Sequence, residues 1–427
     1  MRSRRGAICG LVMGFVVSAA GTAAAWQDPQ ATTEPPVRLP PPDPVIQELV
    51  GRLELDRYKA TIKGLTQFGD RRQGTTRNRN AVDWIEAQLK SVGCTNTERI
   101  RYQYTTPPPR QGGAGNRGAA PPPPQGTPVR TGPGGSTEFG FRGRTGVNNQ
   151  PAAQPDERLR TLNAEPATDG PREEVFCTKV GTTHPDEMYI VGGHMDGIGW
   201  GEAANDDGSG TALVMELARV FSSPDVQTDR SIRFALWNNE ETGTNGARAY
   251  VAQRKDLQGK EDPPGSGKYP EPKWLGMIQH DMMMWDHGMP QPQTDKDGNT
   301  IYVAPKEQRP EADVNIEFQS ASKMAEGAQK LAWIFRAAND RYATDYPAAV
   351  GPHMTNTDSG PFQDFVPAIS LRENERGMQI QAGWDPNWHQ PTDVYTTYSD
   401  KDFRLGLNAA QTTLAAVAQL TGATIKK

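Results

Sequence analysis

The feature that most constrains the fold is an alternation of short apolar segments with longer segments of helical periodicity. Met188–Val191 and Ile232–Trp237 are nearly all apolar, as expected for strands buried on both faces of a sheet. Between them, Thr211–Phe221 has the spacing of an amphipathic helix. This alternation is typical of an α/β domain in which helices cover a central sheet. Further strands are predicted at Thr97–Tyr104, Val175–Val180, Leu275–Gln279 and Ala368–Leu371, and further helices at Asn80–Val92, Ala321–Ala338 and Phe403–Leu420.

The composition excludes several other classes of protein. The 427 residues carry 46 Lys and Arg against 51 Asp and Glu, a net charge of −5, which is not the basic footprint of a nucleic-acid-binding protein. Collagens and coiled coils are excluded because no Gly-X-Y or heptad repeat is present. After the N-terminal segment no apolar run reaches the roughly 18 residues that a membrane span needs. We therefore expect no nucleic-acid partner and no stable membrane insertion of the mature chain.

The first 25 residues have the pattern of an export signal. Three arginines among the first five residues precede an apolar stretch from Ala7 to about Ala20, and small residues end at Ala25. This pattern predicts a signal peptide over 1–25 and a periplasmic or extracellular protein. A Pro-rich linker is predicted over 26–44, followed by one large domain over 45–427.

A long segment between two of the predicted strands lacks apolar periodicity. Residues 105–172 contain 13 Pro and 12 Gly, a composition that cannot bury enough apolar surface to form a core. The segment is therefore predicted to be an insertion, largely disordered, between two strands of one sheet.

Two cysteines remain after removal of the signal peptide. Cys94 and Cys177 lie in or next to predicted strands, and an exported protein passes through a compartment that permits disulfides. One disulfide and two buried free thiols are both compatible with this pattern.

Polar clusters occur where the predicted strands end. In open α/β sheets, ligands bind outside the carboxyl ends of the strands, and two imidazoles with three carboxylates at such an edge suit a pair of ions such as Zn²⁺. Taken singly, each cluster is unremarkable, since Glu240-Glu241 could be a solvated loop and Asp206-Asp207 a helix cap. The order and placement of all five together indicate a metal site. The clusters are His194-Met195-Asp196, Asn205–Gly210, Glu240-Glu241, Asp281 and His389.

Three of these segments resemble signature blocks of a known family. Ile190–Asp196, Asn205–Gly210 and Leu236–Gly243 are similar to those of peptidase family 28, the co-catalytic zinc aminopeptidases and their relatives. The likeness extends to the segments around Asp281, Asp358 and His389, and so covers roughly Leu49 to the C-terminus apart from the insertion. The resemblance implies a zinc peptidase domain with the zinc-exopeptidase fold, a three-layer α/β/α sandwich around a mixed, mostly parallel sheet.

The resemblance also implies a role for each site residue. His194 and Asp281 would bind one zinc ion, Glu241 and His389 the other, and Asp206 would bridge the two. Glu240 would be the general base, and Asp196 would accept the other ring N–H of His194 and orient it. Co²⁺ or Mn²⁺ could occupy the same ligands. The family pattern also places a cis peptide after the bridging aspartate.

One block departs from the family pattern, and the fold allows other activities. Thr357-Asp358-Ser359 stands where aminopeptidases usually have Ser-Asp-His. The favoured activity is an aminopeptidase acting on peptides. A glutaminyl cyclase and a carboxypeptidase share the fold, and fold alone does not determine chemistry. Retention of all five ligands and Glu240 argues against a homologue that only binds. The oligomeric state and the preferred N-terminal residue are not predicted.

Overall fold

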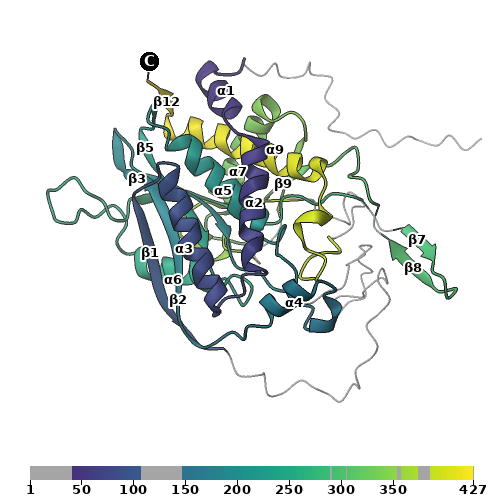
Figure 1. Ribbon diagram of the computed structural model, residues 1–427. Helices are drawn as coiled ribbons and strands as arrows, with labels where there is room; N and C mark the ends of the chain where they lie inside the picture. The colour runs from purple at the N-terminus through teal and green to yellow at the C-terminus, as the bar shows by residue number, and fades with distance from the viewer. Residues whose placement is uncertain are drawn as a thin grey trace, which may run out of the picture. The chain divides into compact units, whose positions relative to one another are not determined.

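The computed structural model describes residues 41–106, 147–288, 291–303, 305–352, 357–373 and 385–426. The predicted signal peptide and the linker up to residue 40 lie outside these ranges. The chain from Pro41 onward is one compact unit, built on an eight-stranded sheet with the order β1-β2-β5-β3-β6-β11-β9-β10 (Figure 1). Its strands are β1 (Thr97–Tyr104), β2 (Gly170–Lys179), β3 (His184–His194), β5 (Arg230–Trp237), β6 (Lys273–His280), β9 (Val314–Phe318), β10 (Ala348–Pro352) and β11 (Ala368–Arg372).

The four central strands of the sheet are parallel, and an antiparallel pairing joins them to the strands on either side. β5, β3, β6 and β11 run in one direction. β2 is antiparallel to β5, and β9 is antiparallel to β11. The mixed, mostly parallel sheet predicted from the family resemblance is confirmed. Because the four central strands are parallel, their carboxyl ends lie at the same edge.

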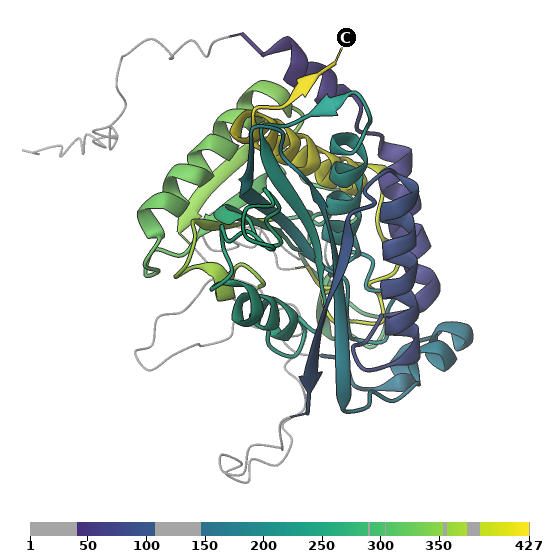
Figure 2. The ribbon, with the colours of Figure 1, turned by 90° about the vertical axis from the view of Figure 1, so that its left-hand side faces the viewer.

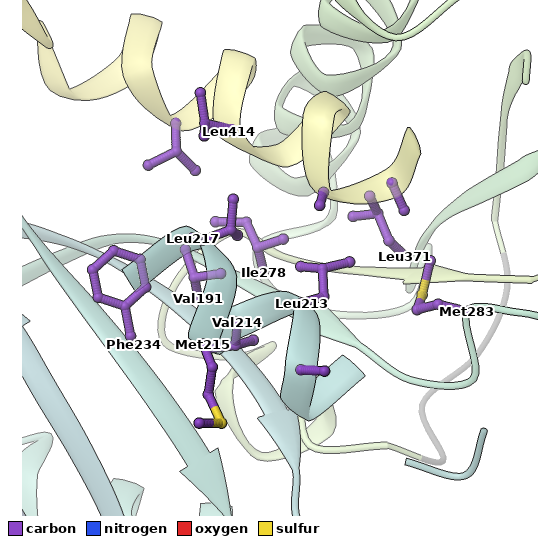
Figure 3. Close-up of a cluster of buried hydrophobic side chains, with 14 of the residues drawn as sticks. Val191, Leu213, Val214, Met215, Leu217, Phe234, Ile278, Met283, Leu371 and Leu414 are labelled. Carbon is purple, nitrogen blue, oxygen red and sulfur yellow. The ribbon is translucent and has the colours of Figure 1, made fainter. Parts of the chain in front are cut away.

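Helices cover the two faces of the sheet unequally. Tyr189 and Val191 on β3 point into a large core shared with most of the helices, whereas Met188 and Ile190 point into a smaller one. This alternation is the period of two expected of a strand buried on both faces. Figure 3 shows part of the larger core, where residues of β3, β5 and β6 meet α5 and α9. Its helices are α1 (Pro44–Gly51), α2 (Leu55–Leu65), α3 (Thr76–Ser91), α5 (Gly208–Phe221), α7 (Ala325–Tyr342) and α9 (Asp400–Thr421).

The second face is covered by α6 (Asn245–Arg254) and the short η3 (Gly360–Phe362). Tyr250 of α6 packs against Trp237, Trp274 and Phe362 with ring centroids 5.3–5.9 Å apart. Aromatic rings at this spacing bury large areas in a small volume, so one helix suffices to close this face over β5. Figure 2 shows the sheet between its helical layers, and the predicted α/β sandwich is confirmed.

All six predicted strands and all four predicted helices are present; β1 has the predicted bounds, and the ends of the others are shifted. The helix predicted from Asn80 begins at Thr76, because the Thr75 side chain accepts a hydrogen bond from the Asn78 N–H and caps it. The helix predicted from Ala321 begins at Ala325, after a turn in which Ser322 N–H donates to Gln319 O. Helix α1 includes Pro44, the last residue of the predicted linker, because the Asp43 side chain caps it.

The prediction of a disordered insertion is wrong for residues 147–172. This part contains η2 (Pro151–Ala153), α4 (Glu157–Asn163) and the first residues of β2. Gln154 and Asn163 are 2% exposed, and polar side chains rather than apolar periodicity hold the segment in place. Residues 107–146 lie outside the described ranges. The ends of the insertion do join two strands of one sheet, since β1 pairs with β2.

Cys94 and Cys177 form a disulfide within the larger core, with Cα atoms 5.9 Å apart. The small strands β4 (Val226–Gln227) and β12 (Thr424–Ile425) pair with each other, as do β7 (Gln291–Thr294) and β8 (Thr300–Val303). Two further turns are η1 (Thr66–Phe68) and η4 (Tyr395–Thr397). None of the helices in the described ranges combines the length and apolar character of a membrane span.

Candidate metal centre

The parallel strands bring the predicted site residues to one edge of the sheet. His194 is the last residue of β3, Glu240 and Glu241 follow β5, and Asp281 follows β6. Asp206 precedes α5, which crosses back over the sheet, and the peptide between Asp206 and Asp207 is cis. His389 comes from the loop before α9. All five predicted ligands therefore converge from five separate segments.

These ligands form two groups that share one residue. His194, Asp206 and Asp281 each offer an atom within 4.8 Å of the others, and so do Asp206, Glu241 and His389. Asp206 Oδ1 lies 3.3 Å from His194 Nε2, whereas Asp206 Oδ2 lies 3.0 Å from His389 Nε2. One carboxylate thus presents an oxygen to each group, as a bridging ligand would.

The tautomer of His194 indicates that a cation belongs in the first group. Its Nδ1 lies 3.0 Å from the backbone carbonyl of Asp196, which can only accept, so Nδ1 carries the proton. In the neutral ring Nε2 then holds a lone pair, yet it faces Asp206 Oδ1 at 3.3 Å and Asp281 Oδ1 at 3.7 Å. Three acceptors facing one another require a proton or a metal ion between them.

The second group has the same character. His389 Nε2 faces Glu241 Oε2 at 2.7 Å and Asp206 Oδ2 at 3.0 Å, and the buried Glu241 Oε1 makes no hydrogen bond within the described chain. Imidazole nitrogens with carboxylate oxygens are the donor set of Zn²⁺ sites. The residues therefore fit a pair of ions held by His194, Asp206 and Asp281 and by Asp206, Glu241 and His389.

The electrostatics show what the protein does without such ions. Burial would lower the pKa of His194, but the carboxylates of Asp207, Asp206 and Asp281 raise it well above its usual range. Burial likewise opposes the rise in the pKa of His389 that Glu241 and Asp206 cause. Burial raises the pKa of Glu241 to about 7, with a further contribution from Asp206. Bound protons thus offset the negative charge of these carboxylates, which metal ions would otherwise neutralise.

Glu240 lies beside the ligands without belonging to either group. Its backbone N–H donates to Asp196 Oδ1 across 3.0 Å, which ties the Glu240-Glu241 turn to the segment after His194. Burial raises the pKa of Glu240 well above its usual range, and although His194 opposes this shift, Asp358 and Glu241 add to it. A carboxyl group adjacent to a ligand, with a raised pKa, is suited to exchange protons at neutral pH.

Asp196 contacts His194 differently from the way the sequence predicts. Its backbone carbonyl, not its carboxylate, lies within hydrogen-bonding distance of Nδ1, since the nearest carboxylate oxygen is 3.8 Å away. The carboxylate instead accepts the Glu240 N–H. Asp196 therefore touches both His194 and the Glu240 turn, with a different group toward each.

Several buried residues support the predicted ligands but belong to no recognisable sequence motif. Arg372 Nη2 donates to Asp281 Oδ2 at 2.6 Å. Asp393 accepts the backbone N–H groups of Asn205 at 2.8 Å and Asp206 at 3.1 Å. Their only sequence signal is that a charged residue stands near the end of a strand or close to a predicted ligand.

Arg71 holds the loop between His194 and Asp206 from the opposite side. Its guanidinium is fully buried and donates to the carbonyls of Met195, Glu202 and Ala203 at 2.6–2.8 Å. The guanidinium is a donor only, so it suits these carbonyls, and the carboxylates of Asp393 and Asp70 oppose the lowering of its pKa by burial. Arg71 therefore fixes the backbone of a loop that carries little regular structure.

Three histidines without a predicted role have none in the two ligand groups. His280 is buried and lies 2.8 Å from Thr413 Oγ1 and 3.1 Å from Gly192 O. His287 Nε2 lies 2.7 Å from Asp402 Oδ1. His184 is the first residue of β3, at the opposite end of the strand from His194, and His353 lies outside the described residues.

A family model decides the identification. The model of peptidase family M28 matches residues 175–413, more than half of the chain. The chain belongs to peptidase family M28. The matched region contains all seven residues that the sequence analysis places in the site, so the family and the site geometry concern the same part of the molecule.

Individual relatives of this M28 chain match it over shorter stretches. Aminopeptidase YwaD of Bacillus subtilis is 40% identical over 80 residues, 18% of this chain and 17% of YwaD. Carboxypeptidase Q of Xenopus laevis is 34% identical over 76 residues, 18% of this chain and 16% of its own length. The chain thus spans less than a fifth of these curated relatives.

The solved structure of BSAP, a zinc aminopeptidase from Bacillus subtilis, is similar over almost its whole length. The TM-score is 0.53 with 16% identity, and the match covers 88% of this chain and 96% of BSAP. At this identity the likeness shows a shared fold.

Proposed function

We propose that this M28 chain is an exported metallo-exopeptidase, and specifically an aminopeptidase that removes N-terminal residues from peptides. The observation that carries the proposal is the pair of ligand groups joined through Asp206, with Glu240 beside them. Zn²⁺ is the proposed ion because each group offers imidazole and carboxylate donors, and Co²⁺ or Mn²⁺ could take its place.

Metal binding and proton transfer would be carried out by different residues of the chain. His194 and Asp281 would hold one ion, Glu241 and His389 the other, and Asp206 would hold both. Two such ions, when bound, would lower the pKa of a shared water molecule and polarise the scissile carbonyl. The Glu240 carboxylate would take a proton from the water as the water oxygen bonds to the carbonyl carbon, and would deliver that proton to the amine nitrogen as the C–N bond breaks.

Contacts from Asp196 fix the positions of His194 and Glu240. The Asp196 backbone carbonyl fixes the tautomer of His194, so that Nε2 faces the ligand group. The Asp196 carboxylate holds the Glu240 N–H, which sets the position of the base relative to His194. Asp196 is therefore proposed to link the first ligand group to the general base.

The comparisons favour an aminopeptidase and supply a second candidate. YwaD, whose name describes an aminopeptidase, is the relative with 40% identity. Carboxypeptidase Q matches over a similar length, so a carboxypeptidase is the second candidate. The position of the substrate's free terminus separates the two.

The test is product analysis on a peptide panel, by mass spectrometry, with and without a chelator. The panel has free, acetylated and Gln-initiated N-termini, each with a free or amidated C-terminus. Loss of single residues only from free N-termini, abolished by chelator, is the expected result. C-terminal trimming, loss of ammonia from the Gln peptides, or no reaction would replace the proposal by a carboxypeptidase, a glutaminyl cyclase or a binding protein, respectively.

Export is tested separately on the intact precursor. Expression in a bacterial host followed by fractionation should place the mature protein outside the cytoplasm, with an N-terminus at Trp26. Retention of the first 25 residues on a cytoplasmic protein would contradict this part of the proposal.

A further inference from the structure

Two loops that carry ligands pack directly against each other. The first runs from His194 to Asp206, and the second includes His389. Glu202 N–H donates to Asp393 O across 2.7 Å. A Cβ atom at Gly201 would lie 2.7 Å from Gln390 O, so only glycine allows this approach. The position of His389 therefore depends on how these backbones are held together.

One side chain bridges the two loops from outside them. Gln154 Nε2 donates to Trp200 O in the first loop at 2.7 Å and to Pro391 O in the second at 2.9 Å. Gln154 is 2% exposed, so neither carbonyl could exchange this donor for bulk water without a local rearrangement. Its Oε1 accepts the Asp156 N–H, which fixes the orientation of the amide.

The segment around Gln154, residues 147–163, makes further contacts with the same loops, and we call it the strap. Asn148 N–H donates to the carbonyl of His389 itself at 3.0 Å. Asn163 Nδ2 donates to Gly201 O at 2.8 Å, while its Oδ1 accepts from Arg77 and from the Asp70 backbone. The strap thus connects both ligand loops to the helical layer.

His194 and Asp281, the two residues that belong to the first ligand group alone, are positioned by the sheet. His194 and Asp281 stand at the ends of the adjacent strands β3 and β6, which are joined along their length by the ladder of the sheet. His389 has a positive φ of 56° and belongs to no strand or helix. A non-glycine residue in this conformation persists only where its surroundings hold it there.

We propose that the strap, acting through Gln154, is a positioning element that holds His389 against Asp206 and Glu241 and so sets the affinity of the second ligand group for its metal ion. This inference rests on the proposed function, because it assumes that the two groups bind metal. Gln154 is a positioning residue, since it touches neither the ligands' donor atoms nor the reacting atoms.

The test is a titration of the metal-free protein with Co²⁺, monitored by calorimetry and by visible absorption. His389→Ala identifies the binding phase that belongs to the second group. In Gln154→Met, which keeps the volume and loses both donors, the affinity of that phase should fall about 10- to 100-fold while the other phase is unchanged. Gln154→Asn has a shorter amide that reaches at most one carbonyl, so its affinity in that phase should lie between those of the wild type and Gln154→Met. This variant also provides the test if Gln154→Met does not fold.

Asn339→Leu is the matched control. Asn339 is also buried, and its amide donates to two carbonyls, Ala343 O and Tyr346 O, at the end of α7. The Asn339→Leu substitution should lower the stability of the protein without changing the affinity of either binding phase. Equal loss in both phases, or the same loss in Asn339→Leu as in Gln154→Met, would overturn the inference and leave the metal centre standing. A wild-type protein that binds fewer than two ions would instead overturn the proposed metal centre itself.

Discussion

Arg372 donates a hydrogen bond to Asp281 Oδ2 across 2.6 Å, and both side chains are buried, at 2% and 4% exposed. Although burial would raise the pKa of Asp281, the Arg372 guanidinium brings it below its usual range. The contact occupies one carboxylate oxygen and leaves Oδ1 facing His194. Arg372 therefore decides which oxygen of Asp281 is available to a metal ion.

Replacing Arg372 should weaken the first metal site. In Arg372→Met, Asp281 loses the partner that orients it, and we expect a loss of about 10- to 100-fold in affinity for one ion. Titration of the metal-free variant with Zn²⁺ measures this loss. The phase assigned to Glu241 and His389 should stay unchanged, and an unaltered first phase would show that the sheet alone positions Asp281.

Glu240→Gln should separate metal binding from catalysis. The substitution keeps the size of the side chain and removes the carboxylate that takes the proton, so turnover should fall about 10²- to 10⁴-fold while both ions stay bound. Metal content and turnover of the same sample provide the measurement. Glu241→Gln is the matched control at the adjacent position. It should lose turnover and, unlike Glu240→Gln, also affinity for one ion. Activity like that of the wild type in Glu240→Gln would remove Glu240 from the role of base.

The metal-free protein should lose stability as the pH rises from about 4 to 8. Burial raises the pKa of Glu241 and of Asp393 to about 7. Each group binds its proton more tightly in the folded than in the unfolded state, so its stabilising contribution is present below its unfolded pKa and is lost as the pH rises through 7. His194 and His389, whose pKa values are also raised, act in the same direction.

Metal should reverse this trend, because ions compete with protons for the same ligands and bind more tightly as the pH rises. Thermal unfolding of the metal-free and the Zn²⁺-loaded protein from pH 5 to 8 checks both statements. The gap between the two melting temperatures should widen with pH. A constant gap would mean that the buried carboxyl groups do not hold the protons assigned to them.

Reduction of the Cys94–Cys177 disulfide should lower stability without removing the fold. The bond joins the segment between α3 and β1 to β2, across a sequence separation of 83 residues, and a link of this kind contributes about 2–4 kcal/mol. Denaturant unfolding with and without reductant measures the difference. The double variant Cys94→Ala, Cys177→Ala should match the reduced protein and be insensitive to reductant, and a reductant effect of equal size in that variant would contradict the assignment.

The ligands were predictable from the sequence because they adjoin strands. The candidate ligands His194, Glu241 and Asp281 follow apolar segments, whose composition alone indicates strands buried on both faces. Once those strands are parallel, their carboxyl ends must meet at one edge. Asp206 and His389 stand in loops without periodicity of their own, but their polar clusters follow the predicted strands as well, and the family resemblance added the role of each residue.

The strap was not predictable by the same reasoning. Gln154 and Asn163 are buried for their hydrogen bonds to loop carbonyls, and a polar side chain in a Pro- and Gly-rich segment gives no periodic signal. The partners of Asp196 escaped prediction for a similar reason, because sequence spacing does not show whether its carbonyl or its carboxylate faces His194.

The sequence by itself determined the α/β architecture, the membership of the central strands and the choice of candidate ligands, since these follow from local apolar patterning and from residues adjacent in the chain. Only the tertiary structure decided that Asp206 faces both histidines, that Arg372 takes one oxygen of Asp281, and that Gln154 joins the two ligand loops. Each of these is a hydrogen bond or close contact between segments far apart in sequence. The geometry of each contact is set by how the layers of the domain pack, and no local sequence pattern encodes the distance between such segments.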